Sequence, residues 1–524
     1  MIDTVLQVPT EASEIAAPDI AWSMIAPLIV LAIGGILLIT ITSLVPTLKD
    51  NWFPAAFTAA TAVIAGGFVV NIWDILGDGP GQLVVADSMM VDRYTLFVTG
   101  VICIAVFFVS LLFHGYLERE GFSSPEWYVL VLMSASGGIL LASAEDLIVT
   151  FVGLEILSIA VYVLASLHLR RSESQEAGFK YFLLGALASA LFLYGIALTY
   201  GATGSTKLST ISSAGVNGRG LSPAVDSSLI LVAMALLMVG FAFKVSAVPF
   251  HLWTPDVYEG SPSPVVAFMA SAVKVAGFAG LARVFFVGFG PYVDDWRPLL
   301  QGLAIASLVV GSFLAVAQDN VKRMLAYSSI THAGFVLIGI YAAADSNGSS
   351  EGTLGSQAFL FYLLSYTIMV AGTFGVVTLI GRVDDGHHSL SDYKGLYKSN
   401  PVLAALMSVL LFAQAGIPFT SGFLAKFRVI AAAADSEAYV LAGIAMLASV
   451  VAAVLYLRVV VSMFLSEADV NEGDDELPVG LPSLPSVGVA AVGLAVVATV
   501  ALGVLPYGQD ILTDAAEAVA AMPR

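Results

Sequence analysis

Long apolar runs recur along the whole chain, with short polar segments between them. A helix needs about 20 apolar residues to cross a bilayer, and we count fourteen runs of about that length. Their approximate spans are 20–44, 53–75, 93–115, 126–144, 147–168, 178–201, 228–252, 263–287, 298–317, 323–343, 356–381, 401–430, 437–464 and 484–505. This pattern predicts an all-α polytopic membrane protein with about 14 transmembrane helices.

Composition agrees with a membrane protein, because 58% of the 524 residues are hydrophobic and only 11% are charged. That is too much apolar surface for a soluble fold. Cys103 is the only cysteine, which excludes an intrachain disulfide and a cysteine metal site. We find no phosphate loop, dinucleotide glycine motif or cluster of metal ligands. We therefore expect no redox centre in this chain, and no nucleic acid among its partners.

Basic residues give an orientation, because Lys and Arg collect in cytoplasmic loops. Four acids and no basic residue precede the first span, which argues against a cleaved signal peptide. With the N-terminus outside, the inner loops hold Lys49, Arg119, Arg170, Arg171, Lys180, Lys322, Arg323, Arg382, Lys394 and Lys398. The outer side then holds only Arg93, Lys207, Arg219, Arg297 and Arg524. An even number of spans predicts that both termini lie outside the cell membrane.

The formal charge of -18 comes largely from acids in loops such as "SEADVNEGDDELP", which starts at Ser466. We interpret these loops as a halophilic adaptation, since salt screens the repulsion between acidic groups. An acidic docking face is the alternative. "DDGHHS", from Asp384, carries metal-capable side chains in an inner loop. We expect a solvated turn there and not a metal site.

Two parts of the chain repeat each other. "LASAED" from Leu141 resembles "LAVAQD" from Leu314, and "AVPF" from Ala247 resembles "GIPF" from Gly416. Units of about five helices entered from opposite sides would be inverted repeats, which are typical of transporters. We expect helices 1–3 in 1–125, the first repeat in 126–290, the second in 291–466, and an acidic loop with a last helix in 467–524.

Pro249 and Pro418 occupy similar positions in the two repeats, each within a long predicted span. Proline removes a backbone donor, so we expect both residues to break helices 7 and 12. A packing kink is the alternative for either proline alone. Two matched breaks favour a hydrated path through the membrane.

Four charged residues lie within apolar runs: Glu155, Lys244, Lys274 and Lys426. Each charge at the centre of a span costs roughly 2.5–3.5 kcal/mol, so pairing or water must offset it. A structural ion pair is the alternative for Glu155 or Lys244 alone. The full set predicts a proton or cation relay.

We expect Glu155 to act as a switch for Lys244. Approach of the carboxylate keeps the amine charged, and separation favours proton release. His251 and His332 carry side chains that titrate near neutrality and are candidates for passing protons onward. A buried, hydrogen-bonded structural histidine is the alternative for each.

"VPFHLWTPDVYEGSPSPVVAF", from Val248, resembles the signature of the N subunit of proton-pumping NADH-quinone oxidoreductases, respiratory complex I. "SSITHAGFVL", "LSDYKGLYKSNP" and "AGIPFTSGFLAKF" support the resemblance, which runs from about helix three to helix thirteen. The M and L subunits and the D subunit of sodium/proton antiporters are related. They more often have Leu-Pro-Asp where this chain has Trp253-Thr254-Pro255-Asp256.

The resemblance implies two inverted five-helix units, each contributing a half-channel. It implies that Glu155 is the carboxylate of the fifth helix, Lys244 the lysine of the broken seventh, Lys274 the connecting lysine of the eighth and Lys426 the terminal lysine of the broken twelfth. Lys180 matches a further lysine at the start of the sixth helix, where an interfacial anchor is the alternative. His251 and His332 match histidines of the family.

The function implied is that of a proton-translocating subunit, which couples quinone reduction elsewhere in a complex to proton pumping. The alternatives are a subunit of a multisubunit cation/proton antiporter and a structural subunit with an inactive channel. The resemblance implies M-, L-, K-, J- and A-type membrane subunits as partners, within a lipid bilayer. Quinone and iron-sulfur clusters are expected in partner subunits, and the electron donor stays open among NADH, deazaflavin and ferredoxin.

Overall fold

The computed structural model describes residues 20–49, 52–77, 79, 81–122, 124–218, 227–344, 350–381, 383–465, 486–505, 509–520 and 522. Within these residues, 13 helices are long and apolar enough to cross a membrane, which confirms the all-α polytopic architecture. The predicted span 401–430 accounts for the difference from fourteen, because it is divided between two shorter helices. The acidic loop that starts at Ser466 and the N-terminal acids lie outside the described residues.

The helices of the first half are α1 (Ala26–Leu44), α2 (Phe53–Leu76), α3 (Arg93–Glu120), α4 (Glu126–Ser143), α5 (Leu147–Ser166), α6 (Ser172–Thr203), α7 (Leu208–Gly218), α8 (Ser227–Val245), α9 (Trp253–Gly260), α10 (Ser263–Phe268) and α11 (Lys274–Arg283). Those of the second half are α12 (Val293–Val316), α13 (Val321–Ala343), α14 (Ser350–Ile380), α15 (Leu396–Ser399), α16 (Pro401–Ala415), α17 (Ser421–Asp435), α18 (Tyr439–Leu465), α19 (Ser486–Val504) and α20 (Gln509–Ala520). Strands β1 (Gln82–Val84) and β2 (Met89–Val91) form an antiparallel hairpin with Leu83 opposite Met90.

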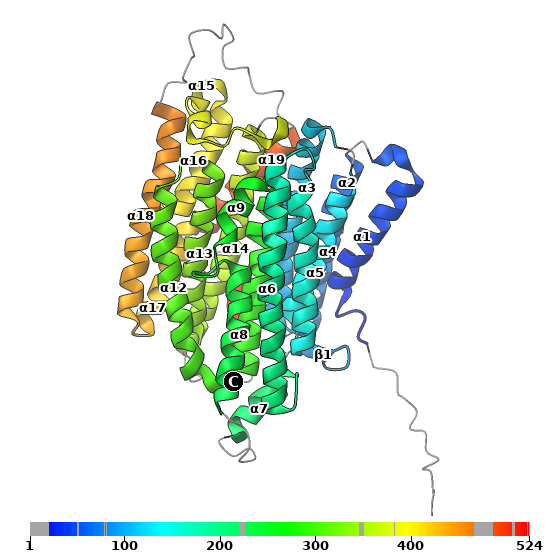
Figure 1. The fold of residues 1–524 in the computed structure, drawn as a ribbon, viewed down its shortest axis with the longest axis vertical. Coiled ribbons are helices and arrows are strands. Elements are labelled where there is room, and N and C mark those ends of the chain that lie inside the picture. Colours follow the sequence, from blue (N-terminus) through cyan, green and yellow to red (C-terminus); the bar gives the residue numbers. More distant parts are fainter. Residues whose placement is uncertain are drawn as a thin grey trace, which may run out of the picture.

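The long helices stand side by side in one bundle (Figure 1). Helix α1 leans away from the bundle at one edge, and α18 lies at the opposite edge. Helix α15 lies at one end of the bundle, whereas β1, α7 and the C-terminus lie at the other end. We refer to these as the α15 end and the hairpin end. By the distribution of basic residues, they are the predicted inner and outer ends.

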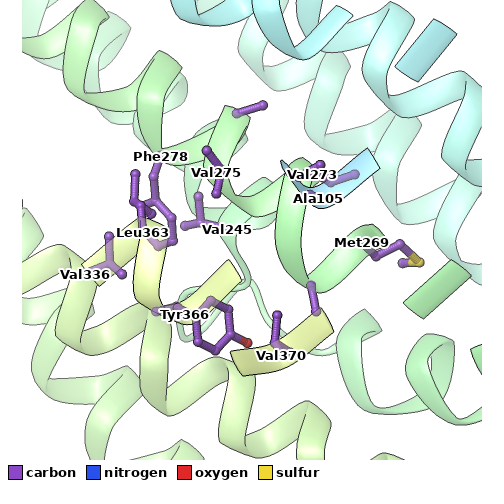
Figure 2. Packing of buried hydrophobic residues seen from close by; sticks show 14 of the residues in the cluster. Ala105, Val245, Met269, Val273, Val275, Phe278, Val336, Leu363, Tyr366 and Val370 are labelled. Atoms are coloured by element: carbon purple, nitrogen blue, oxygen red, sulfur yellow. The ribbon is translucent and has the colours of Figure 1, made fainter. Parts of the chain in front are cut away.

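The centre of the bundle is a continuous helical rod over Ser263–Gly288, in which π-helical turns flank α11. Every residue of this rod is buried. Figure 2 shows Val275 and Phe278 of α11 close to Leu363 of α14, with Val245 of α8 on the same side. The rod therefore contacts both halves of the chain, and Lys274 at the start of α11 lies between them.

Helix α8 ends in a Schellman motif, in which a left-handed residue reverses the chain. The Ala247 N–H donates to the Ala242 carbonyl at 2.8 Å, and the Ser246 N–H donates to the Phe243 carbonyl at 3.1 Å. Ser246 has a φ of 62°. The helix thus ends before Pro249, which lies in the turn leading to α9.

Helix α16 ends in the same way. The Ile417 N–H donates to the Phe412 carbonyl and the Gly416 N–H to the Ala413 carbonyl, both at 3.0 Å. Gly416 has a φ of 91°. Pro418 therefore also lies in a connecting turn, outside the helices that precede and follow it.

The last helix was not anticipated from the sequence. Helix α20 lies beyond the last apolar run and packs against α3 and α14 at the hairpin end. Asp514 of α20 pairs with Arg93 of α3 at 3.3 Å. Its short, amphipathic sequence has no long apolar run, which is why hydropathy does not reveal it.

Candidate functional site

Lys244 and Glu155 each bond a serine. The Lys244 amine is buried and donates to the Ser158 hydroxyl at 2.8 Å. The Ser189 hydroxyl donates to the half-buried Glu155 carboxylate. Lys244 also lies over the Tyr162 ring, with its amine 5.8 Å from the ring centroid. Helices α5, α6 and α8 therefore hold these groups in one polar patch within the membrane.

A small cavity joins the two serines. It has a volume of about 10 Å³ and is lined by Ser158, Ser189 and Lys244, among others. This volume is at the lower limit for one water molecule. The electrostatic interaction of Glu155 with Lys244 thus acts across serine hydroxyls. The switch between these two side chains stays a prediction from the sequence.

Lys180 lines a larger cavity at the α15 end, with a volume of about 320 Å³. Its amine lies 2.6 Å from Glu176 and 3.0 Å from Asp256. Arg323 bridges Asp256 and Glu259, at 2.8 Å from each. This cavity, which we call the vestibule, is lined by Arg171, Glu173, Glu176, Ala177, Lys180, Asp256, Glu259, Gly260, Asn320, Arg323, Asp385, Gly386, His387 and His388.

An aromatic pair connects the vestibule to Lys244. Tyr181 follows Lys180 on α6, and its ring stacks on Trp253 with centroids 4.3 Å apart. Trp253 lies about one helical turn before Asp256 on α9. The Lys244 amine lies over the Tyr181 ring, 5.7 Å from its centroid.

Lys274 belongs to a buried hydrogen-bond network at the centre of the bundle. Its amine donates to the Ser329 carbonyl at 2.8 Å and to the Ser329 hydroxyl at 2.5 Å. The Tyr366 hydroxyl donates to the Ser329 hydroxyl oxygen at 2.8 Å. The Tyr366 ring then lies 4.8 Å from the His332 ring. Polar groups of α11, α13 and α14 are thus neighbours in space, one after another.

His332 continues this network into the second half. Its two ring nitrogens bond the hydroxyls of Tyr362, at 2.7 Å, and Tyr456, at 3.0 Å. The Tyr456 hydroxyl bonds Ser328 at 2.5 Å. His332 also interacts electrostatically with both Lys274 and Lys426. The fold therefore brings these three predicted residues together.

Lys426 reaches back across the second helix break. Its amine donates to the Ala415 carbonyl at 3.1 Å, at the end of α16. It also lies 5.2 Å from the Phe335 ring, which stacks on Tyr362. The same amine thus caps a helix end and faces the aromatic side of the His332 network.

His251 lies apart from this network. It is buried in the turn between α8 and α9, and its Nδ1 makes no hydrogen bond within the described residues. Its side chain interacts with the Pro249 backbone. Within the described residues, no hydrogen bond or ion pair joins that side chain to the predicted proton-transfer residues Glu155, Lys180, Lys244, Lys274, His332 and Lys426. His251 matches a histidine of the family, but it makes no such contact with the proton-transfer residues in the described part of this structure.

The prediction of a solvated turn at "DDGHHS" is wrong for two of its residues, because Asp385 and His388 are buried. Asp385 bonds Lys322 at 3.1 Å and the Ser263 hydroxyl at 2.8 Å, and lies 3.2 Å from His388 and 3.5 Å from Arg171. Burial alone would raise the pKa of Asp385, but Lys322, His388 and Arg171 hold it well below its usual range. Burial lowers the pKa of His388.

One group of metal-capable side chains was also missed from the sequence. Ligand atoms of Glu120, His168 and Asp384 lie within 4.8 Å of one another. Glu120, however, already pairs with Arg119 at 3.2 Å and accepts the Asp384 N–H at 2.8 Å. We therefore interpret the group as an ion-pair cluster. The three residues lie far apart along the chain, so the sequence gives no sign that they are neighbours.

Comparisons with known proteins show the family to which the chain belongs. A family model described as NADH:quinone oxidoreductase/Mrp antiporter, TM, matches residues 144–452. The NADH-quinone oxidoreductase subunit N of Trichlorobacter lovleyi is 37% identical over 488 residues, which cover 93% of this chain and 96% of that protein. The chain belongs to the NADH-quinone oxidoreductase subunit N family. The resemblance seen in the sequence is thereby confirmed.

Another relative and two solved structures extend the comparison. Subunit N of Chloroflexus aggregans is 37% identical over 491 residues, 93% of this chain and 96% of that protein. A chain of respiratory complex I from Thermus thermophilus with bound aureothin has a TM-score of 0.73 and 34% identity, covering 92% of this chain and 97% of that chain. A chain of the Mrp complex from Dietzia sp. has a TM-score of 0.76 at 21% identity, covering 96% and 98%, and shares the fold.

Proposed function

We propose that this chain is a proton-translocating membrane subunit of an NADH-quinone oxidoreductase-type complex. The observation that carries the proposal is the buried network from Lys274 through Ser329, Tyr366 and His332 toward Lys426. Buried ionisable groups within a membrane are costly and mark ion or proton paths. Because the chain belongs to the subunit N family, we propose that the ion carried along this path is the proton.

In this proposal, Lys244 and Glu155 load the path from the vestibule. The vestibule is wide enough for many waters, whereas the cavity at Ser158 and Ser189 holds about one. Lys180 and Asp256 form an ion pair in the vestibule, at the predicted inner end. A change in the position of Glu155 then sets whether Lys244 keeps its proton.

Lys274 passes the proton between the two units, because it is the ionisable group that the central rod contributes to the network. His332 relays it, since each of its nitrogens already bonds a hydroxyl. Lys426 is the terminal carrier. The inverted relation of the units, including the channel role of Pro249 and Pro418, belongs to this proposal.

We assign electron transfer and quinone reduction to partner subunits, which would hold the quinone and the iron-sulfur clusters. The partners proposed are the M-, L-, K-, J- and A-type membrane subunits. The chain would lie in the cell membrane with both termini outside. The electron donor is not specified by any residue described above.

Lys244→Arg tests the proposal. An arginine keeps the positive charge but does not deprotonate in a protein. A relay residue should therefore lose function when replaced by Arg or by Met, whereas a structural cation should tolerate Arg. The whole complex, reconstituted in vesicles, should assemble and reduce quinone while pumping fewer protons per quinone reduced. Lys207→Arg, an exposed lysine at the hairpin end, is the matched control.

Full pumping by Lys244→Arg would rule out Lys244 as a carrier. A sodium ion in place of the proton would appear as sodium uptake that a protonophore does not abolish. Normal pumping by variants of Lys244, Lys274 and Lys426 alike would refute the proposed function itself.

A further inference from the structure

A second buried ionic cluster lies at the hairpin end, away from the network described above. Arg283, the last residue of α11, is 1% exposed and donates to both carboxylate oxygens of Asp92 at 2.8 Å. It also donates to the Thr95 hydroxyl at 2.8 Å and to the Ala142 carbonyl at 2.7 Å. The guanidinium is therefore engaged chiefly by Asp92.

Glu145 is the third charged member of this cluster. It is 4% exposed and lies between α4 and α5. Its N–H donates to the Ser88 carbonyl and its carbonyl accepts from the Leu208 N–H, both at 2.9 Å. The side-chain carboxyl accepts a hydrogen bond from the Ser209 backbone and interacts with Arg283 and Asp92. The hairpin and α7 thus fix its backbone from two sides.

The charges of the cluster do not balance. Asp92 and Glu145 are both buried and share one guanidinium, which cannot give up its proton. A buried charge without a full partner costs several kcal/mol, and binding a proton removes that cost for a carboxylate. The groups that face Glu145 are Arg283, Asp92 and Asp146. Burial is the largest influence on Glu145 and raises its pKa.

The cluster also lies at the hairpin end of the helix whose first residue is Lys274. Lys274 is the first residue of α11 and Arg283 is the last. Nine residues of α-helix separate the central network from the cluster by about 14 Å. A cavity of about 20 Å³, lined by Thr95, Thr99 and Ser143, lies beside the cluster and has room for one water.

We propose that Glu145 binds and releases the transported proton at the hairpin end of the first unit, with Arg283 and Asp92 as its fixed electrostatic partners. Glu145 is then a proton carrier for the reaction, and Arg283 is a positioning residue. The inference rests on the proposed function, because it requires protons to travel through this chain.

Glu145→Gln is the direct test, since glutamine resembles the protonated acid but cannot release a proton. In the reconstituted complex, Glu145→Gln should reduce protons pumped per quinone by the same fraction as Lys274→Met. Glu145→Asp should retain most of the pumping. Asp87→Asn, which changes an exposed acid at the same end, should leave pumping unchanged.

Infrared difference spectra of the complex supply a readout that a structural carboxylate would not change. Stepping the external pH should reveal a protonated-carboxyl band that disappears in Glu145→Gln and moves in Glu145→Asp. This measurement decides the question if Glu145→Gln does not assemble, because an unmoved band in Glu145→Asp overturns the proposal.

The two proposals fail in different ways. Normal pumping by Glu145→Gln alongside impaired pumping by Lys274→Met would overturn the role of Glu145 alone. Normal pumping by both variants would instead overturn the proposed function.

Discussion

Lys322 and Asp385 form an ion pair whose side chains are both 0% exposed. Asp385 also accepts from the Ser263 N–H at 3.0 Å, at the start of the central rod. One carboxylate therefore joins the loop after α14 to α13 and to the rod. Removing one member of a buried pair leaves an uncompensated charge.

Asp385→Asn should therefore destabilise the protein by about 3–5 kcal/mol. The pKa of Asp385 is held below its usual range, so the carboxylate stabilises the fold above about pH 4, its ordinary unfolded value, and loses this effect as the pH falls further. The difference in thermal unfolding temperature between wild type and Asp385→Asn should be constant from about pH 5 to 8 and shrink below about pH 4.

Asp384→Asn is the control, because Asp384 is exposed and both positions have a positive φ that asparagine tolerates. It should unfold at nearly the wild-type temperature. Equal losses in the two variants would mean that the turn geometry, and not the buried charge, provides the stability.

Sequence alone revealed the residues whose chemistry conflicts with their surroundings. Glu155, Lys244, Lys274 and Lys426 stand out because each interrupts an apolar run. Ser329, Tyr362, Tyr366 and Tyr456 do not stand out, because serine and tyrosine are common in membrane helices and only their contacts give them a role. Asp385 was misjudged, because loop sequences do not show what the rest of the fold packs over them.

At the scale of elements, the two helix breaks share one hydrogen-bond pattern. The prolines signalled both breaks in the sequence, but each helix ends two or more residues earlier, at a left-handed residue. Proline disfavours a helical conformation in the residue before it, which explains why the helix ends upstream. The exact end depends on the capping hydrogen bonds, which no sequence pattern specified.

Helix α17 approaches the second break closely at Gly422. A Cβ added there would lie 1.9 Å from the Ala413 carbonyl oxygen, so backbone would have to move. Gly422→Ala should displace α17 from α16 and separate Lys426 from the Ala415 carbonyl. We expect a loss of stability at least as large as the 1–3 kcal/mol of ordinary overpacking, measured by thermal unfolding of the assembled complex.

Gly443→Ala provides the comparison, since a Cβ at that helical position meets nothing within 4 Å. It should leave stability unchanged or increase it by up to about 1 kcal/mol. If Gly422→Ala is as stable as Gly443→Ala, the close approach of α17 does not hold the break together.

At the scale of the whole molecule, the apolar runs sufficed to predict a helical membrane bundle, because each span is decided by its own length and hydropathy. The arrangement of the spans was not available from that pattern. Burial of the rod Ser263–Gly288 on every side depends on which helices surround it. Apart from Lys274 and Arg283, its sequence is apolar enough to face lipid as well.

The orientation in the membrane is a prediction of the basic-residue distribution. The C-terminus and the start of α1 lie at the hairpin end, and the loop that contains Lys394 lies at the α15 end (Figure 1). Reporter fusions after Arg524 and beside Lys394 should therefore report opposite sides, with the C-terminal reporter outside.

A third fusion beside Lys49, in the predicted inner loop after α1, should agree with the Lys394 reporter. Reporters at Arg524 and Lys394 on the same side would contradict the predicted topology. If the Arg524 reporter lies inside and the Lys394 reporter lies outside, the orientation is the reverse of the predicted one. The vestibule would then face the outside, and the Glu145 cluster would face the inside.

The cavity beside Ser158 and Ser189 has a consequence for a membrane at rest. A voltage of 100 mV drives each elementary charge with about 2.3 kcal/mol, so any continuous file of water would leak protons whenever turnover stopped. A space of about 10 Å³, with Tyr162 and Phe192 in its wall, interrupts such a file at a single molecule. At this point the described structure leaves no continuous file of water, so a proton leak through Lys244 would require the cavity to widen.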